Sequence, residues 1–269
     1  MAVESIGYLR TVEPREPVVL FTDSDQENQL TGPLRELDVQ VEILEGAQFS
    51  FVDKIDGISR SPFAKTIFLD SDTFPIRPFA SDMYRALDFC ELLALGGVGL
   101  NHAWEETRFS PAISQYNTGV LGLSAHATSA FVPEWGRIYR SEENPKHDQS
   151  SFRAAVLESG VRCAPLPPAF NYMGHGSVAR ARILHFTGAR RAQAFYKSPR
   201  ARERLIHEFA TAEAPGFFAH FAPASSAHAV LGRNAGGRLS WWFGGIGHWF
   251  FARLRRLLRE AFRTASRRG

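Results

Sequence analysis

The architecture of this chain can be predicted outward from Lys65-Thr-Ile-Phe-Leu-Asp-Ser-Asp-Thr-Phe-Pro-Ile-Arg-Pro78. The apolar run 67–69 is typical of a buried strand, and the acidic residues and prolines that follow end that strand. Asp70 and Asp72 therefore stand where a strand leaves the core. Side chains two residues apart on extended backbone point the same way. Because two neighbouring carboxylates repel each other when they lose water, the pair predicts a divalent cation between them.

The rest of the chain has the composition of an ordinary globular protein, with 44% hydrophobic and 22% charged residues among 269. Strand-like and helix-like patterns alternate. We predict helices over 2–10, 51–58, 79–87, 124–140 and 150–159, and strands over 18–21, 39–44, 65–69, 91–95, 116–123, 161–166 and 183–186. This alternation is typical of an α/β fold in which a mainly parallel, mixed sheet lies between helices.

Composition also predicts the domain organisation. Residues 1–212 carry the strand and helix patterns, residues 213–240 are rich in Ala, Gly, Ser and Pro and are predicted to be a linker, and residues 241–269 form a tail. From Arg233 onward the chain holds nine arginines and one glutamate, a net charge of +8, whereas residues 1–232 hold 22 basic and 27 acidic residues, a net charge of −5. The net positive charge of the chain thus comes from its end, which argues against a nucleic-acid-binding protein.

The tail has the pattern of an amphipathic helix. Phe250, Leu254 and Leu258 share one face, and arginines occupy the opposite face. An arginine-rich polar face bordered by Trp and Phe is typical of a helix that lies on an anionic membrane. The alternative is a helix docked on its own domain with a solvated basic face.

Localisation is predicted from three further features. Residues 1–16 contain charges without an apolar core, which argues against a signal peptide. No stretch approaches the roughly 20 apolar residues of a membrane span. Cys90 and Cys163 lack CxxC spacing, which is compatible with a reducing compartment. We therefore expect a cytoplasmic protein with peripheral contact at the inner face of the membrane.

Four motifs occur in a defined order: residues 65–73, Tyr116-Asn-Thr-Gly119, Asp148-Gln149 and Leu184-His-Phe-Thr-Gly188. Together they resemble the GT-A nucleotide-diphospho-sugar glycosyltransferases, in particular the glycogenin-like, family-8-like group with its Asp-x-Asp motif. Asp-x-Asp alone is a weak signal, and the ordered set is more specific. The resemblance covers residues 1–191. It implies retaining transfer of a sugar from a nucleotide-diphosphate donor, expected to be a UDP-sugar, to a saccharide or lipid-linked acceptor.

The resemblance also implies a metal site. Asp70 and Asp72 match the family's metal-binding pair, with Ser71 between them at the donor site, and His185 matches its third protein ligand. Two carboxylates and an imidazole suit Mn²⁺, with Mg²⁺ as the alternative. Such a metal would bridge the two phosphates and stabilise the negative charge that builds on the leaving diphosphate.

Further donor contacts follow from the same resemblance. Lys54 is expected to contact the nucleotide or the sugar, and Asn117, Thr118 and Gly119 are expected to lie beside the donor sugar. Asp148 and Gln149 are expected near the reacting carbon. Gly188 and Arg191 are expected at the diphosphate. Arg191 falls where the family often has a lysine, so the positive charge is kept with a different geometry. Arg190 is an alternative to Arg191.

One feature departs from the family. Its members begin with a strand before the helix that here starts at residue 2, and that strand lies inside the sheet and carries residues that hold the base. We therefore expect a sheet in which the first strand is missing, with altered base recognition.

Simpler interpretations stay open for single residues. Asp148 could be a helix cap, Lys54 a solvated helix lysine, and His185 a core histidine. If the reaction inverts the anomeric carbon instead, the general base would be Asp148, Glu105 or Glu106.

Two other functions fit parts of the sequence. A phosphohydrolase of the haloacid-dehalogenase type also has an apolar strand followed by two aspartates. That family has Thr or Val two residues after the second aspartate, where this chain has Phe74. An inactive, membrane-associated binding module would result if the missing strand prevents donor binding.

Removal of residues 241–269 is expected to lower binding to anionic liposomes, because it removes the basic amphipathic segment. Co-sedimentation with anionic vesicles measures this, with neutral phosphatidylcholine vesicles as the control. Equal binding of the full and shortened chains to anionic vesicles would contradict the membrane interpretation of the tail.

Overall fold

The computed structural model describes residues 2–24, 32–97, 113–143, 145, 147–173 and 180–186. It also describes the backbone of four strands at 176–177, 217–220, 228–233 and 239–243, and single residues or pairs between 200 and 211. The chain forms two compact units, residues 1–173 with 181–186 and residues 174–180 with 187–269. The predicted site residues that the structure describes all belong to the first unit.

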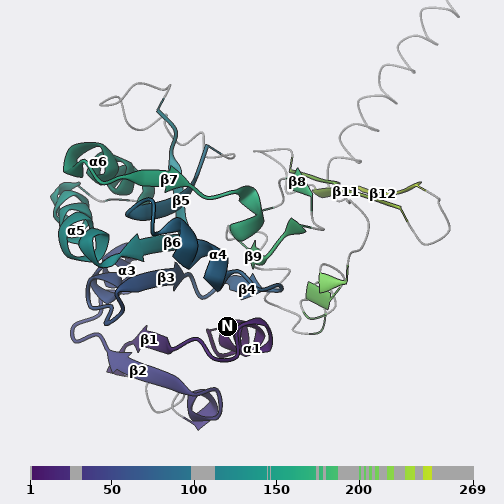
Figure 1. Ribbon diagram of the computed structural model, residues 1–269, viewed down its shortest axis with the longest axis horizontal. Helices are drawn as coiled ribbons and strands as arrows, with labels where there is room; N and C mark the ends of the chain where they lie inside the picture. The colour runs from purple at the N-terminus through teal and green to yellow at the C-terminus, as the bar shows by residue number, and fades with distance from the viewer. Residues whose placement is uncertain are drawn as a thin grey trace, which may run out of the picture. The chain divides into compact units, whose positions relative to one another are not determined.

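The first unit alternates helices and strands much as the sequence predicts (Figure 1). Its elements in chain order are α1 Ala2–Val12, β1 Val18–Thr22, β2 Val39–Ile43, α3 Phe51–Ser59, β3 Lys65–Leu69, β4 Thr73–Pro75, α4 Ala80–Ala86, β5 Leu92–Gly96, β6 Tyr116–Ser124, the π-helix η2 Ala127–Phe131, α5 Val132–Ser141, α6 Gln149–Ser159, β7 Cys163–Pro165, the 3-10 helix η3 Pro168–Phe170 and β9 Ile183–His185. The single helix predicted over 124–140 is thus η2 followed by α5.

The central sheet is mixed, as predicted. Its strand order is β3-β6-β5-β7. Both β3 and β5 pair antiparallel with β6, and β5 pairs parallel with β7. Three strands therefore run in one direction and β6 runs in the other. This topology brings the end of β3 beside the start of β6, where Leu69 is paired with Val120.

Two smaller ladders complete the first unit. β1 and β2 pair in parallel. β4 and β9 pair antiparallel, with Thr73 opposite His185. The second ladder joins the segment after the acidic motif to the last strand of the unit.

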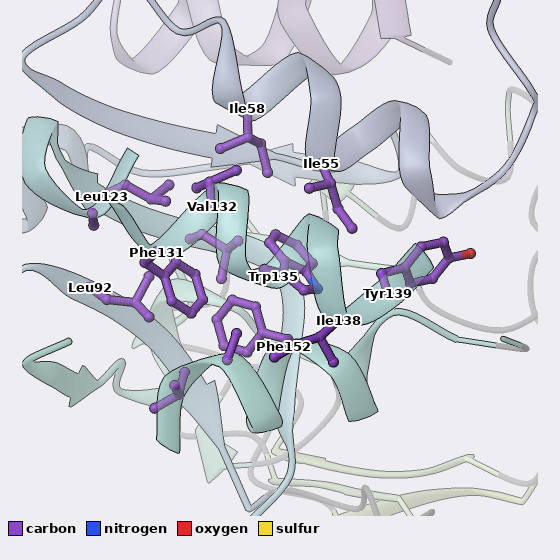
Figure 2. Packing of buried hydrophobic residues seen from close by; sticks show 14 of the residues in the cluster. Ile55, Ile58, Leu92, Leu123, Phe131, Val132, Trp135, Ile138, Tyr139 and Phe152 are labelled. Carbon is purple, nitrogen blue, oxygen red and sulfur yellow. The ribbon is translucent and has the colours of Figure 1, made fainter. Parts of the chain in front are cut away.

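The main apolar core lies where α3, α5 and α6 pack on the sheet. Its centre is an aromatic cluster in which the Phe152 ring lies 4.9 Å from the Trp135 ring and 5.2 Å from the Phe131 ring, measured between centroids. Figure 2 shows these rings with Ile55 and Ile58 of α3 on one side. The strands beneath them, β5 and β6, are almost fully buried, so the core holds the central strands firmly in place.

The opposite end of the sheet is less complete. The apolar strands β1 and β3 are mostly half-buried, and both line a cleft of about 330 Å³. Among the residues that the structure describes, β1 pairs with β2 and β3 pairs with β6, and no strand lies between β1 and β3. This arrangement fits the prediction of a sheet that lacks its first strand.

The second unit contains an antiparallel sheet. Its strands are β8 Gly176–Ser177, β10 Phe217–His220, β11 His228–Arg233 and β12 Leu239–Phe243, in the order β12-β11-β10-β8. Strands β10 and β11 fall within the predicted linker, and β12 overlaps its end and the first residues of the predicted tail. The predicted boundaries at 212 and 240 remain predictions, and residues 244–269 lie outside the described part. Within the described part, no helix is long and apolar enough to cross a membrane.

Phe152→Ala is expected to lower the free energy of unfolding by about 3–5 kcal/mol, because it leaves a cavity among fully buried rings. Urea denaturation followed by circular dichroism measures the change. Phe89→Ala is the matched control, since the Phe89 side chain is 82% exposed and its loss should change stability by less than about 0.5 kcal/mol. Similar losses in both variants would contradict this description of the core.

Candidate functional site

The acidic motif is held at the end of β3 by backbone hydrogen bonds. The Asp70 N–H donates to the Gly119 carbonyl oxygen at 2.8 Å, and the Asp70 carbonyl accepts from the Thr73 N–H at 3.0 Å and its hydroxyl at 2.7 Å. The chain thereby turns into β4. Because Thr73 of β4 is paired with His185 of β9, the imidazole comes to lie beside Asp72, with Nε2 3.3 Å from Asp72 Oδ1.

Asp70, Asp72 and His185 fit a divalent cation. Each offers one ligand atom, and these atoms lie within 4.8 Å of one another. Two carboxylate oxygens and one imidazole nitrogen suit Mn²⁺ or Mg²⁺. Burial raises the pKa of the Asp70 carboxyl, and the positive charge of Lys54 only partly offsets this. A bound cation would act in the opposite direction, because it favours the ionised carboxylate.

Lys54 reaches the same motif from α3. Its Nζ lies 3.1 Å from Asp70 Oδ1, 3.1 Å from Asp148 Oδ2 and 3.0 Å from Thr118 Oγ1. Burial disfavours the ammonium, but the carboxylates of Asp70 and Asp148 outweigh this effect, so the pKa of Lys54 is raised. The side chain is only 11% exposed, which argues against the alternative of a solvated helix lysine.

Asp148 lies at the first turn of α6, and its carboxylate faces the site. The side chain is buried, and Oδ2 accepts a hydrogen bond from the Thr118 hydroxyl at 2.8 Å in addition to its contact with Lys54. Among the described residues it makes no capping hydrogen bond to α6. The helix-cap interpretation therefore does not account for this carboxylate. Its backbone carbonyl is held by the Trp135 indole N–H at 3.2 Å, so the aromatic core positions Asp148.

The 117–119 element of β6 supports the imidazole. The Gly119 N–H donates to Asn117 Oδ1 at 3.0 Å. A Cβ atom on Gly119 would lie only 2.0 Å from Cε1 of His185. Glycine is therefore required here for close approach, since any side chain would occupy the space of the imidazole.

Comparisons with known proteins support this topology. No family model and no curated protein sequence matches the chain. Among solved structures, the glycosyltransferase GlyE from Streptococcus pneumoniae TIGR4 matches at 16% identity and a TM-score of 0.52. The galactosyltransferase LgtC matches at 13% identity and 0.51, and the bifunctional glycosyltransferase WbbM at 12% identity and 0.51.

The chain has the GT-A fold. The alignments cover 79% of it with GlyE, 78% with LgtC and 77% with WbbM. It spans 57% of GlyE and 49% of WbbM, but 90% of LgtC. At these identities the likeness concerns the fold, so the roles of individual residues depend on the geometry above.

Two further residues predicted for the site adjoin its charged residues in the chain. Ser71 is exposed between the two aspartates, and Gln149 is the half-buried first residue of α6. Other predicted residues lie outside the described part of the chain, and they are Gly188, Arg190, Arg191, Glu105 and Glu106.

One buried polar residue beside the cluster was missed by sequence reasoning. Asn171 is fully buried, and its amide contacts both Asn117 and His185 at 2.8 Å. In the sequence it follows the proline-rich segment 165–168, where a polar residue is typical of a turn. No local pattern signals its contact with a residue 14 positions later.

Gly119→Ala is expected to weaken Mn²⁺ binding at least about tenfold, because the new methyl group displaces the His185 ring. Electron paramagnetic resonance of free Mn²⁺ during a titration measures the affinity. Gly96→Ala serves as the control, since a Cβ there would meet its neighbours at ordinary contact distances of 3.7 Å or more. An unchanged Mn²⁺ affinity in a folded Gly119→Ala protein would contradict the placement of His185 at the metal.

Proposed function

We propose that this chain is a metal-dependent glycosyltransferase that moves a sugar from a nucleotide-diphosphate donor, a UDP-sugar, to a saccharide or lipid-linked acceptor with retention of configuration. The main observation in support of this proposal is the cluster of Asp70, Asp72 and His185 at a strand end of a GT-A fold. A buried lysine and a buried carboxylate lie directly beside it. This combination of opposite charges suits a ligand that carries both phosphates and a polar sugar.

The metal, when bound, would stabilise the charge on the leaving diphosphate. Asp70, Asp72 and His185 would hold it, and Lys54 adds a positive charge beside Asp70. The lysine also holds the Asp148 carboxylate in the site, because it contacts the same oxygen that accepts from Thr118. Both of these contacts are made by Oδ2, and we assign Oδ1 of Asp148 to orienting a sugar hydroxyl.

The 117–119 element contributes mainly through Thr118 in this proposal. Asn117 Oδ1 accepts from the Gly119 N–H and from the Asn171 amide, which uses both of its lone pairs. If Asn117 contacts the nucleotide sugar, its amide nitrogen would therefore make that contact. Gly188 and Arg191, with Arg190 as the alternative, remain proposed diphosphate contacts, and Gln149 a proposed neighbour of the reacting carbon.

Support for the substrate class comes from the LgtC structure, which was determined with donor and acceptor sugar analogues. LgtC covers 78% of this chain. The GT-A fold of the chain argues against the haloacid-dehalogenase alternative. Peripheral membrane contact through residues 241–269, and hence a location at the inner face of the membrane, stays part of the proposal.

A panel of nucleotide sugars with Mn²⁺ tests the proposal, with released nucleoside diphosphate as the readout. At least one donor should give release that stops when EDTA removes the metal. Asp72→Ala should lower the rate by about 10²-fold or more, because it removes a ligand that stabilises developing charge.

Asp88→Ala is the matched control for that experiment. Asp88 is an exposed aspartate that pairs with Lys65 at 2.5 Å, away from the cluster, and its loss should leave the rate unchanged. No release with any donor, or equal rates for Asp72→Ala and the unaltered chain, would refute the proposal. Release that is unaffected by EDTA would refute metal dependence.

A further inference from the structure

Asn171 is held beside β9 by the backbone of its neighbour. The Tyr172 N–H donates to the Ile183 carbonyl at 2.8 Å, and the Tyr172 carbonyl accepts from the His185 N–H at 3.0 Å. These two bonds fix the distance between the turn after η3 and the strand that carries the imidazole. The Asn171 side chain, at 0% exposure, is thereby enclosed between Asn117 and His185.

The orientation of the Asn171 amide follows from a backbone donor. The Gly119 N–H can only donate, so the Asn117 atom that it contacts at 3.0 Å must be the carbonyl oxygen. That oxygen also lies 2.8 Å from Asn171, which must then present its amide nitrogen to it. The remaining atom of the Asn171 amide, Oδ1, faces His185 Nδ1 at 2.8 Å.

This orientation determines which ring nitrogen carries the proton. An amide oxygen only accepts, so His185 Nδ1 must donate to it. In the neutral imidazole the lone pair is then on Nε2, and Nε2 lies 3.3 Å from Asp72 Oδ1. A lone pair facing a carboxylate is unfavourable unless a cation joins the two or a proton is added to the ring. The hydrogen-bond directions are therefore compatible with a metal that joins Nε2 to the Asp72 carboxylate.

We propose that Asn171 is a positioning residue that fixes His185 as the Nδ1–H tautomer and presents Nε2 to a divalent cation. Through Asn117 it also joins the metal site to the 117–119 element. The inference rests on the metal site of the proposed function. The relay runs from the Gly119 N–H through Asn117 and Asn171 to His185, and every step is a hydrogen bond of 3.0 Å or less.

The tautomer can be measured without substrate or metal. In the metal-free full chain at a pH where the ring is neutral, two-dimensional ¹H–¹⁵N correlation across the imidazole should report the proton of His185 on Nδ1. In Asn171→Leu the acceptor is lost, so the spectrum should change to the Nε2–H form or a mixture. Mn²⁺ affinity, measured by electron paramagnetic resonance, should fall about 10–100-fold.

Two variants separate positioning from packing. Asn171→Asp keeps an acceptor for Nδ1 and loses only the amide that donates to Asn117, so it should retain the Nδ1–H tautomer and bind Mn²⁺ more tightly than Asn171→Leu. Thr128→Val is the control for loss of a buried polar group, since Thr128 Oγ1 has no hydrogen-bond partner among the described residues. It should change neither the tautomer nor the affinity.

The outcomes are distinct. An Nε2–H tautomer in the unaltered chain overturns the inference, and so does a folded Asn171→Leu protein with an unchanged tautomer and Mn²⁺ affinity. Failure of the unaltered chain to bind Mn²⁺ overturns both the inference and the metal site. If the tautomer and the affinity change as expected but no nucleotide sugar is turned over, the proposed transferase function fails while the role of Asn171 stands.

Discussion

The site depends on compensation of the negative charge of the Asp70 carboxylate by nearby positive charge. Backbone bonds to Gly119 and Thr73 hold Asp70 where β3 ends, so its carboxylate emerges from the sheet beside Asp72. Lys54 approaches from α3, and the position between Asp70 and Asp72 suits a cation. Unpaired charge is costly when it is partly buried. The residues that surround the Asp70 carboxylate therefore come from several elements, namely α3, β6, β9 and α6.

The neutral part of the site is organised just as tightly as the charged part. Asn117 and Asn171 are buried amides, and the oxygen of each accepts hydrogen bonds from defined partners. Such paired buried polar groups favour a single arrangement. The direction of the whole relay comes from one backbone N–H, that of Gly119. Glycine at this position serves two purposes, since it anchors the relay and leaves room for the imidazole ring.

The two ends of the sheet differ in how completely they are packed. Around α5 and α6 the central strands are covered by an aromatic core, and that core also holds Asp148 through the Trp135 indole. At β1 and β3 the apolar strands remain half-buried along a cleft. The cluster of Asp70, Asp72 and His185 lies at the end of β3, which borders that cleft, so the acidic motif is supported by packing mainly from the β6 side.

The sequence by itself determined the acidic pair and most helices and strands of the first unit, because strand and helix periods, proline breaks and the spacing of Asp70 and Asp72 are local properties of the chain. It did not predict β4, which lies within the acidic and proline-rich segment, or the strands β10 to β12. The sequence also indicated the GT-A fold, since the order of the four motifs can be recognised in the sequence without knowledge of long-range contacts. Tertiary structure decided the reversed direction of β6, the contact of Lys54 with Asp148, and the place of Asn171 beside His185. These depend on segments that are distant in sequence and meet only when the core packs, so no period or motif within one segment could specify them.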